Sequence, residues 1–255
     1  MLFKAVANPL NLRTGPSKES SLIGELVFGD TIEAEVTTKN HAADYIKGTV
    51  QTGQHAGKDG YVRRKWIAQV VGGNSFSTEK RVQAAAIIAK RTQQFDSAVY
   101  HLPLSGPSKP TTYKDLAKAG WIDCSGWVFL LAEEILTAYS RTSPAKHLST
   151  MSDSQITKAS LATGLIVSGQ DITDAHLLPG VMLGIDFAEY SWDRNRALDI
   201  DHIVIVGEDA TGRFISQSSS SQGGVNRVPL AKWVNSTLPL RNAWRMHAVD
   251  LLMAP

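Results

Sequence analysis

The order of the apolar patterns along the chain restricts its fold more than any other feature. Residues 1–70 contain short β-rich runs at 22–27, 31–36, 45–50 and 60–62, separated by Gly, Asp, Asn and Pro. Two helical patterns follow this region, and strand patterns begin only after Pro179. Helices that precede a run of hairpin-linked strands favour an α+β domain over a parallel βαβ fold. We therefore predict an α+β chain, with a small all-β barrel followed by helices packed on an antiparallel sheet.

The glycine-containing segment 71–75 is the natural boundary between these two parts. We expect a first domain over 1–70, a linker over 71–78 and a second domain over 79–255. The linker composition is typical of a flexible connection between two compact units.

The second part begins with a helix for which Ser77 is a candidate N-cap and which we expect to end near Gln94. Residues 99–120 are rich in Pro, Ser, Thr and Gly, which predicts a surface loop. A short helix is expected over 151–156. Later strands are expected over 181–185, 203–206 and 214–217. A turn over 207–212 is expected to join the last two.

The composition excludes several classes of function. The 26 Lys and Arg residues are balanced by 24 Asp and Glu residues and are scattered, so we expect no nucleic-acid partner. No apolar run approaches the roughly 18 residues that a membrane span requires. The N-terminus lacks an export signal, which leaves the cytoplasm, or export by a phage, secretion-system or other non-classical route. A monomer without cofactors is expected.

No metal or phosphate site is predicted. His41 and His55 lack metal-ligand spacing, and no H-E-x-x-H motif supports them. The segment 53–59 departs from a phosphate-binding loop in its glycine spacing and ends in Asp59, where that loop has Ser or Thr.

The first seventy residues carry a series of landmarks in a fixed order. These are the segments 10–17, 22–26, 28–31 and 57–62, followed by Trp66-Ile67. Together they resemble the bacterial SH3-type domain, which implies a small barrel that grips the cell wall or shapes the substrate groove of a neighbouring enzyme. The stretch 41–55 is longer than this resemblance predicts and indicates an extended loop.

The only cysteine, Cys124, stands where a polar turn precedes an apolar helix. A thiol at a helix N-terminus is exposed to unpaired backbone N–H groups, which favour the thiolate and lower the thiol pKa to roughly 3.5–7.5 when a base is near. The alternative is inert packing, since a lone cysteine usually behaves as a small hydrophobe.

A cysteine nucleophile requires a base and a group that orients the base. His202 is the best candidate for the base because it directly precedes an apolar strand, although a histidine can also simply begin a strand. Gln217 lies on the following strand, where its amide oxygen could accept Nδ1–H of the imidazole. Ser216 is the competing choice, because strand alternation sends it to the opposite face.

These features together resemble the NlpC-type cell-wall cysteine peptidases, a papain-like family. The resemblance covers roughly residues 80–245 and rests on four elements: Asp123-Cys124-Ser125-Gly126 at a helix start, Leu178-Pro179-Gly180 before a strand, the strand start at 202–207, and the polar strand at 213–217. It implies hydrolysis of the bond between γ-D-glutamate and the diamino acid, diaminopimelate or lysine, in peptidoglycan stem peptides or muropeptides.

The same resemblance implies a role for each matching residue. Cys124 would attack the carbonyl, His202 would exchange the proton, and Gln217 would orient His202. Asp123 and Ser125 would hold the free amine of an N-terminal L-alanine, although Asp123 also suits an N-cap. Backbone N–H groups near Cys124 would stabilise the oxyanion.

The chain also departs from the family pattern. Tyr100 matches only loosely a tyrosine that the family places closer to the cysteine, and Val181 replaces the usual Asp after Pro-Gly. Residues 188–196 look like an insertion whose Trp192 and Arg194 could line the groove, or a plain hairpin tip. Two other functions therefore stay open: an N-acetylmuramoyl-L-alanine amidase, and a wall-binding protein with a degenerate catalytic domain.

Overall fold

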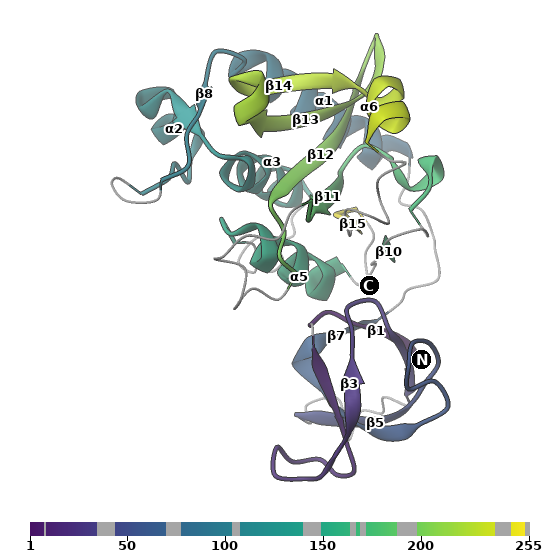
Figure 1. Ribbon diagram of the computed structural model, residues 1–255. Helices are drawn as coiled ribbons and strands as arrows, with labels where there is room; N and C mark the ends of the chain where they lie inside the picture. Colours follow the sequence, from purple (N-terminus) through teal and green to yellow (C-terminus); the bar gives the residue numbers. More distant parts are fainter. Residues whose placement is uncertain are drawn as a thin grey trace.

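The computed structural model describes residues 1–7, 9–34, 44–69, 78–103, 108–139, 149–163, 167–168, 172–187, 198–237 and 246–252. It contains two sheets, one built from the N-terminal residues and one from the rest of the chain (Figure 1). Of the expected linker over 71–78, only residue 78 is among the described residues. The insertion at 188–196 lies wholly outside them. Within the described part, no helix combines the length and the apolar character needed to cross a bilayer.

The N-terminal sheet has seven antiparallel strands in the order β3-β2-β6-β5-β4-β1-β7. Alternate residues of its strands point into one apolar core, which includes Phe3, Leu12, Ile32 and Val62. The strands are β1 (Leu2–Ala5), β2 (Leu10–Arg13), β3 (Leu22–Leu26), β4 (Thr31–Ala34), β5 (Tyr45–Val50), β6 (Asp59–Arg63) and β7 (Ile67–Gln69), with a 3₁₀ turn η1 (Arg64–Trp66).

The four strands expected in this region all form. β5 has the expected bounds, β3 ends one residue earlier, and β6 extends one residue beyond the prediction on each side. Residues 35 and 36, expected in the strand of β4, lie outside the described residues. The region also holds β1, β2 and β7, which were not among the predicted strands.

The second sheet has eight strands in the order β10-β15-β11-β12-β13-β14-β8-β9. Its pairs are antiparallel except for β8 and β9, so the expectation of a purely antiparallel sheet is wrong at that edge. The strands are β8 (Val99–Tyr100), β9 (Trp121–Ile122), β10 (Val167–Ser168), β11 (Val181–Ile185), β12 (His202–Asp209), β13 (Gly212–Ser219), β14 (Gly224–Pro229) and β15 (Met246–Asp250), with 3₁₀ turns η3 (Asp174–His176) and η5 (Ser220–Gln222).

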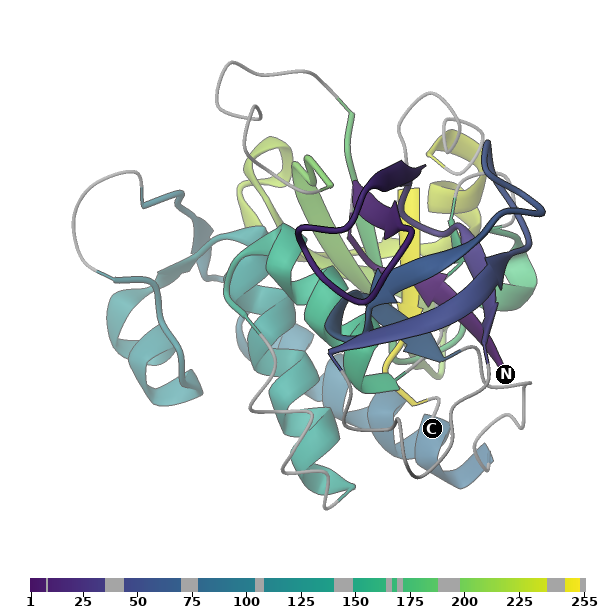
Figure 2. The ribbon, with the colours of Figure 1, turned by 90° about the horizontal axis from the view of Figure 1, so that it is seen from below.

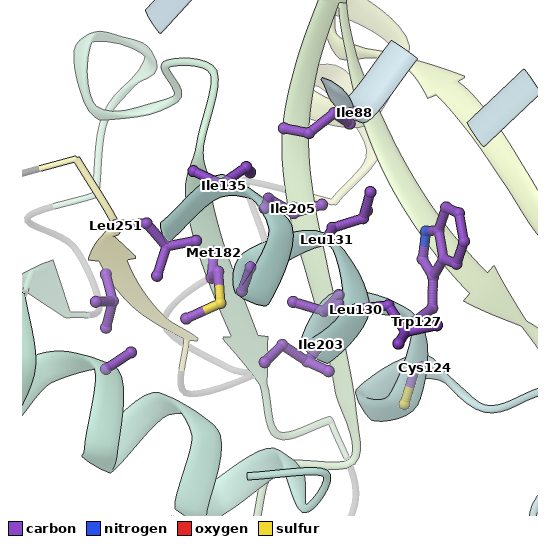
Figure 3. Packing of buried hydrophobic residues seen from close by; sticks show 14 of the residues in the cluster. Ile88, Cys124, Trp127, Leu130, Leu131, Ile135, Met182, Ile203, Ile205 and Leu251 are labelled. Atoms are coloured by element: carbon purple, nitrogen blue, oxygen red, sulfur yellow. The ribbon is translucent and has the colours of Figure 1, made fainter. Parts of the chain in front are cut away.

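Helices cover both faces of this sheet. α1 (Thr78–Gln94) and α3 (Cys124–Ala138) pack against β12, where Ile88, Leu131 and Ile205 belong to one buried cluster (Figure 3). α5 (Ser152–Thr163) packs near β11 and β15, and α6 (Leu230–Ser236) covers the opposite face at β13. The buried side chains of β12 alternate between the two faces, which is why its apolar run is continuous.

Most of the expected helical segments form. α1 ends at the predicted residue, while Ser77 lies outside the described residues. The segment predicted as a loop over 99–120 instead contains β8 and α2 (Tyr113–Ala119), which is capped by the Thr112 side chain. α5 is twice as long as the predicted helix over 151–156, because its buried face packs on the sheet and stabilises further turns.

The N-terminal sheet contacts the rest of the molecule. The rings of Phe28 and His247 meet edge to face at 4.4 Å between centroids, and β7 contacts α5. Figure 2, viewed from the side of this sheet, shows its strands in front of β15. A cavity of about 700 Å³ lies between the two parts, with Arg13 and Trp66 on one wall and Met151 and Lys158 on the other.

Candidate active site

Cys124 is the first residue of α3, directly after the short strand β9. The Asp123 side chain caps the helix by accepting a hydrogen bond from the Gly126 amide at 2.7 Å. A Cβ atom at Gly126 would lie 2.9 Å from Oδ1 of Asp123 and 3.0 Å from a side-chain carbon of Ile122, so a larger residue would disturb the cap. The Asp-Cys-Ser-Gly sequence therefore builds a tight helix start with the thiol at its head.

The thiol is nearly enclosed, with only 6% of Cys124 exposed. Its Sγ lies 4.0 Å from the carbonyl oxygen of Asp201, the residue that precedes β12. Burial, together with the negative charge of Asp123, raises the thiol pKa to about 11. The expected lowering of this pKa by the helix start is therefore wrong, because desolvation outweighs the nearby N–H groups and the ammonium of Lys109.

The second group is the pair of His202 and Gln217. Nε2 of His202 lies 2.8 Å from Oε1 of Gln217, whose own amide nitrogen donates to Oδ1 of Asn226 at 3.1 Å. This chain of bonds directs the Gln217 oxygen at the imidazole. The sequence predicts that Gln217 accepts Nδ1–H, and this is wrong, because the ring nitrogen involved is Nε2. Within the described residues, Nδ1 makes no hydrogen bond.

The strand register explains why Gln217 reaches His202. Ile205 pairs with Ser216 across β12 and β13, so Gln217 lies on the same face as Val204 and, two residues further, His202. Ser216 points to the opposite face, where it is fully buried. Its hydroxyl is 2.7 Å from the Thr92 hydroxyl and accepts the Trp127 indole N–H at 2.9 Å.

The thiol and the imidazole both lie at the start of β12, because Sγ approaches the carbonyl of the residue just before His202. Within the described residues no hydrogen bond joins them. Burial lowers the pKa of His202, and the hydrogen bond that Nε2 donates to Gln217 partly opposes that shift. With a raised thiol pKa and a lowered imidazole pKa, both groups are uncharged at neutral pH.

Asp123 and Ser125, on either side of the cysteine, do not face an open space. Nζ of Lys109 lies 2.6 Å from Oδ2 of Asp123 and 3.0 Å from Oγ of Ser125, and it also donates to the carbonyl oxygen of Thr150 at 2.8 Å. The Ser125 hydroxyl itself donates to that carbonyl at 2.6 Å. These four residues form what we call the lysine cluster.

Tyr100 lies close to the thiol although its sequence match is loose. It pairs with Ile122 in the parallel ladder of β8 and β9, two residues before Cys124. Burial raises the pKa of its phenol, and the negative charges of Cys124 and Asp123 add to that shift. The structure therefore brings Tyr100, Asp123 and Cys124 together.

Three residues of the site escaped the sequence reasoning: Lys109, Thr150 and Asn226. Lys109 lies within the Pro- and Ser-rich segment that we read as a loop, and Thr150 contributes only a backbone carbonyl. Asn226 stands directly opposite Gln217 on β14, a strand that was not predicted. Among the described residues, no three His, Cys, Asp or Glu side chains gather as a metal site requires.

No protein-family model matches the sequence, and no curated protein matches it. Solved structures do resemble it in part. NlpC2 from Trichomonas vaginalis is 14% identical with a TM-score of 0.34, over 91% of this chain and 68% of that one. An NlpC/P60 family protein from Bacillus cereus is 11% identical with a TM-score of 0.33, over 98% and 63%. An N-acetylmuramoyl-L-alanine amidase from Bacteroides uniformis is 12% identical with a TM-score of 0.39, over 66% and 99%.

Proposed function

We propose that this chain is a cysteine endopeptidase that hydrolyses the γ-D-glutamyl–diamino acid bond of peptidoglycan stem peptides. One observation carries the proposal: Cys124 heads α3 beside the start of β12, where His202 is held by Gln217 at 2.8 Å. A nucleophile, a base and a group that orients the base are the parts that such a reaction requires. The three residues come from three separate elements that pack on one core.

In the proposed reaction, Nδ1 of neutral His202 takes the thiol proton as Sγ attacks the scissile carbonyl carbon. The Nε2–H of the resulting imidazolium donates to Oε1 of Gln217, which stabilises the positive charge. The backbone N–H of Cys124 at the helix start donates to the oxyanion. His202 then protonates the leaving amine of the diamino acid, and a thioester to D-glutamate remains on Cys124.

The second half of the reaction reverses these roles. Water enters where the amine left, and Nδ1 of His202 takes one of its protons while the oxygen attacks the thioester carbonyl. The intermediate collapses, the C–S bond breaks, and Sγ recovers the proton from His202. Because thiol and imidazole are both neutral at rest, the charge pair forms only during the attack.

We further propose that residues 1–70 form an SH3-type domain and that residues 79–255 form the peptidase domain. The cavity of about 700 Å³ between the N-terminal sheet and α5 supports a role for both parts in substrate binding. Among the described residues, its walls carry the cationic side chains of Arg13, Lys18, Arg63 and Lys158 and one carboxylate, that of Asp153. This charge suits the carboxylates of a stem peptide.

Digestion of purified sacculi and soluble muropeptides, with products identified by mass spectrometry, tests this proposal. We expect products whose new N-terminus is the diamino acid, and no cleavage by the Cys124→Ala variant. A new N-terminal L-alanine would instead identify an amidase that cuts after N-acetylmuramate. Retained cleavage by a folded Cys124→Ala variant would overturn the assignment of the nucleophile.

A further inference from the structure

The lysine cluster is a complete binding site for an ammonium group. A lysine ammonium has three N–H donors, and Lys109 directs them at a carboxylate oxygen, a hydroxyl oxygen and a backbone carbonyl oxygen, at 2.6, 3.0 and 2.8 Å. The side chain of Lys109 is only 16% exposed and that of Asp123 only 2%. The site is thus built, desolvated and filled by the chain itself.

The lysine cluster lies where it affects which substrate groups can bind beside Cys124. Asp123 and Ser125 immediately flank Cys124, so any group bound between them lies next to the nucleophile. With Lys109 in place, the acceptors of the site are already used, and the Asp123 carboxylate also accepts the Gly126 amide. An additional ammonium would meet the like charge of Lys109, and both oxygens of the Asp123 carboxylate already accept a hydrogen bond.

Binding of an anionic group at this position is also unfavourable. All three donors of Lys109 point at protein oxygens, so a substrate carboxylate would have to break one of those bonds to reach it. A neutral amide requires neither a counter-ion nor the displacement of Lys109. The cluster therefore suits an uncharged group in the adjoining subsite.

We propose that Lys109 occupies the ammonium site in cis and thereby selects stem peptides whose N-terminal alanine is acylated over peptides with a free α-amine. This inference rests on the proposed function and on the resemblance to the NlpC-type peptidases, which implies that Asp123 and Ser125 hold the alanine amine. The preferred substrate class is then the stem peptide still joined to muramate, as in the intact wall or its glycopeptide fragments. Lys109 is a specificity-determining residue and takes no part in bond cleavage.

The test compares two synthetic peptides, L-Ala-γ-D-Glu-diamino acid with a free α-amine and the same peptide acetylated at that amine. The wild type should have the higher kcat/KM for the acetylated peptide. Lys109→Ala vacates the site and should shift the ratio of the two kcat/KM values toward the free amine by ~10-fold or more, since one charge-assisted hydrogen bond alone discriminates at that level. Lys118→Ala removes an exposed lysine of α2 and should leave the ratio unchanged.

Lys109→Gln is the second variant should Lys109→Ala fail to fold. Its amide keeps two N–H donors but no charge, so an incoming ammonium can displace it, and the ratio should shift in the same direction by a smaller factor. Circular dichroism and thermal melting establish that each variant is folded. A wild-type preference for the free amine, or equal ratios in folded Lys109 variants and Lys118→Ala, would overturn the inference.

A binding measurement separates this inference from the proposed function. Calorimetry on Cys124→Ala and Cys124→Ala/Lys109→Ala with the uncleaved free-amine peptide should show tighter binding to the double variant. Equal binding to the two proteins would contradict the role of Lys109. Absence of cleavage of either peptide or of sacculi by the wild type, alongside the predicted gain in binding, would refute the catalytic proposal alone.

Discussion

The two sides of Cys124 are organised by different physical means. On the β12 side, His202, Gln217 and Asn226 form a chain of neutral hydrogen bonds. On the helix-start side, Asp123 and Lys109 form a desolvated ion pair at 2.6 Å. The neutral side can change its charge by accepting a proton, whereas on the charged side the carboxylate and the ammonium already neutralise each other.

This difference separates proton transfer from substrate selection. Among the influences on the thiol pKa, the charge of Asp123 is second only to burial, while Lys109 opposes it more weakly. Burial therefore keeps the resting thiol protonated, and the charge of Asp123 adds to this effect. The proton must leave toward the neutral side, where imidazole can take it and Gln217 can stabilise the product.

Breaking the ion pair should produce the largest change. Lys109→Met keeps the aliphatic stem and leaves the Asp123 carboxylate buried without its counter-ion, so we expect a loss of about 3 kcal/mol in the free energy of unfolding. This value is at the lower end of the range for a buried ion pair, because the Asp123 carboxylate still accepts the hydrogen bond from the Gly126 amide. Urea denaturation followed by circular dichroism measures it.

Two further variants check the origin of that loss. Lys109→Met/Asp123→Asn removes both charges and should recover part of the lost stability. Arg227→Met breaks an ion pair with Asp209 whose side chains are 43% and 24% exposed, and should cost no more than about 1 kcal/mol. An equal loss in Arg227→Met and Lys109→Met would show that burial of the pair is unimportant.

On the neutral side, Gln217→Ala removes the acceptor that holds Nε2 of His202. A hydrogen bond to a group that becomes charged contributes about 1.5–3 kcal/mol, so kcat/KM should fall by roughly 10- to 150-fold. Assays on muropeptides detect this change. Ser216→Ala, one residue away on the opposite face, should lower Tm but reduce kcat/KM less; the reverse order would make Ser216 the orienting residue.

The raised thiol pKa predicts slow alkylation of Cys124. At pH 8, a pKa of about 11 instead of 9.0 reduces the thiolate fraction roughly 100-fold, and the greater nucleophilicity of a more basic thiolate recovers about tenfold. Iodoacetamide should therefore react roughly tenfold more slowly than with an ordinary thiol, before any effect of limited access. Rapid alkylation at pH 6 would instead indicate a resting thiolate.

The smallest effect concerns the pH dependence of cleavage. His202 must be uncharged to accept the thiol proton, and its pKa lies below the ordinary value of 6.5 because burial disfavours the charged ring. Activity should therefore persist below pH 6.5 and fall only as His202 becomes protonated. The Gln217 hydrogen bond raises this pKa, so Gln217→Ala should move the acid limb of kcat/KM to lower pH; a shift to higher pH would contradict the assignment.

Local patterns predicted much of the α+β framework. The apolar period of α3 and the apolar runs of β11, β12 and β13 depend on neighbours within a few residues, and these elements form where we expected them. The turn expected over 207–212 is wrong in its bounds, because residues 207–209 and 212 pair within the β12–β13 ladder and leave only residues 210 and 211 between the strands. The segment containing β8 and α2 failed as a loop prediction because its order comes from pairing with Ile122 and from packing of Leu116. Strands β14 and β15 are stabilised by sheet partners, which no local pattern identifies.

The sequence by itself determined the cysteine at a helix start, the histidine at a strand start, and Asp123 and Ser125 beside the thiol, because each depends on adjacent residues. Only the tertiary structure decided that Gln217 and not Ser216 meets His202, since this depends on the register of β12 against β13. It also decided that Lys109 fills the site between Asp123 and Ser125, and that the thiol pKa rises. The position of Lys109 and the raised thiol pKa both result from burial by segments that are distant in the sequence. Neighbouring residues alone do not predict such desolvation.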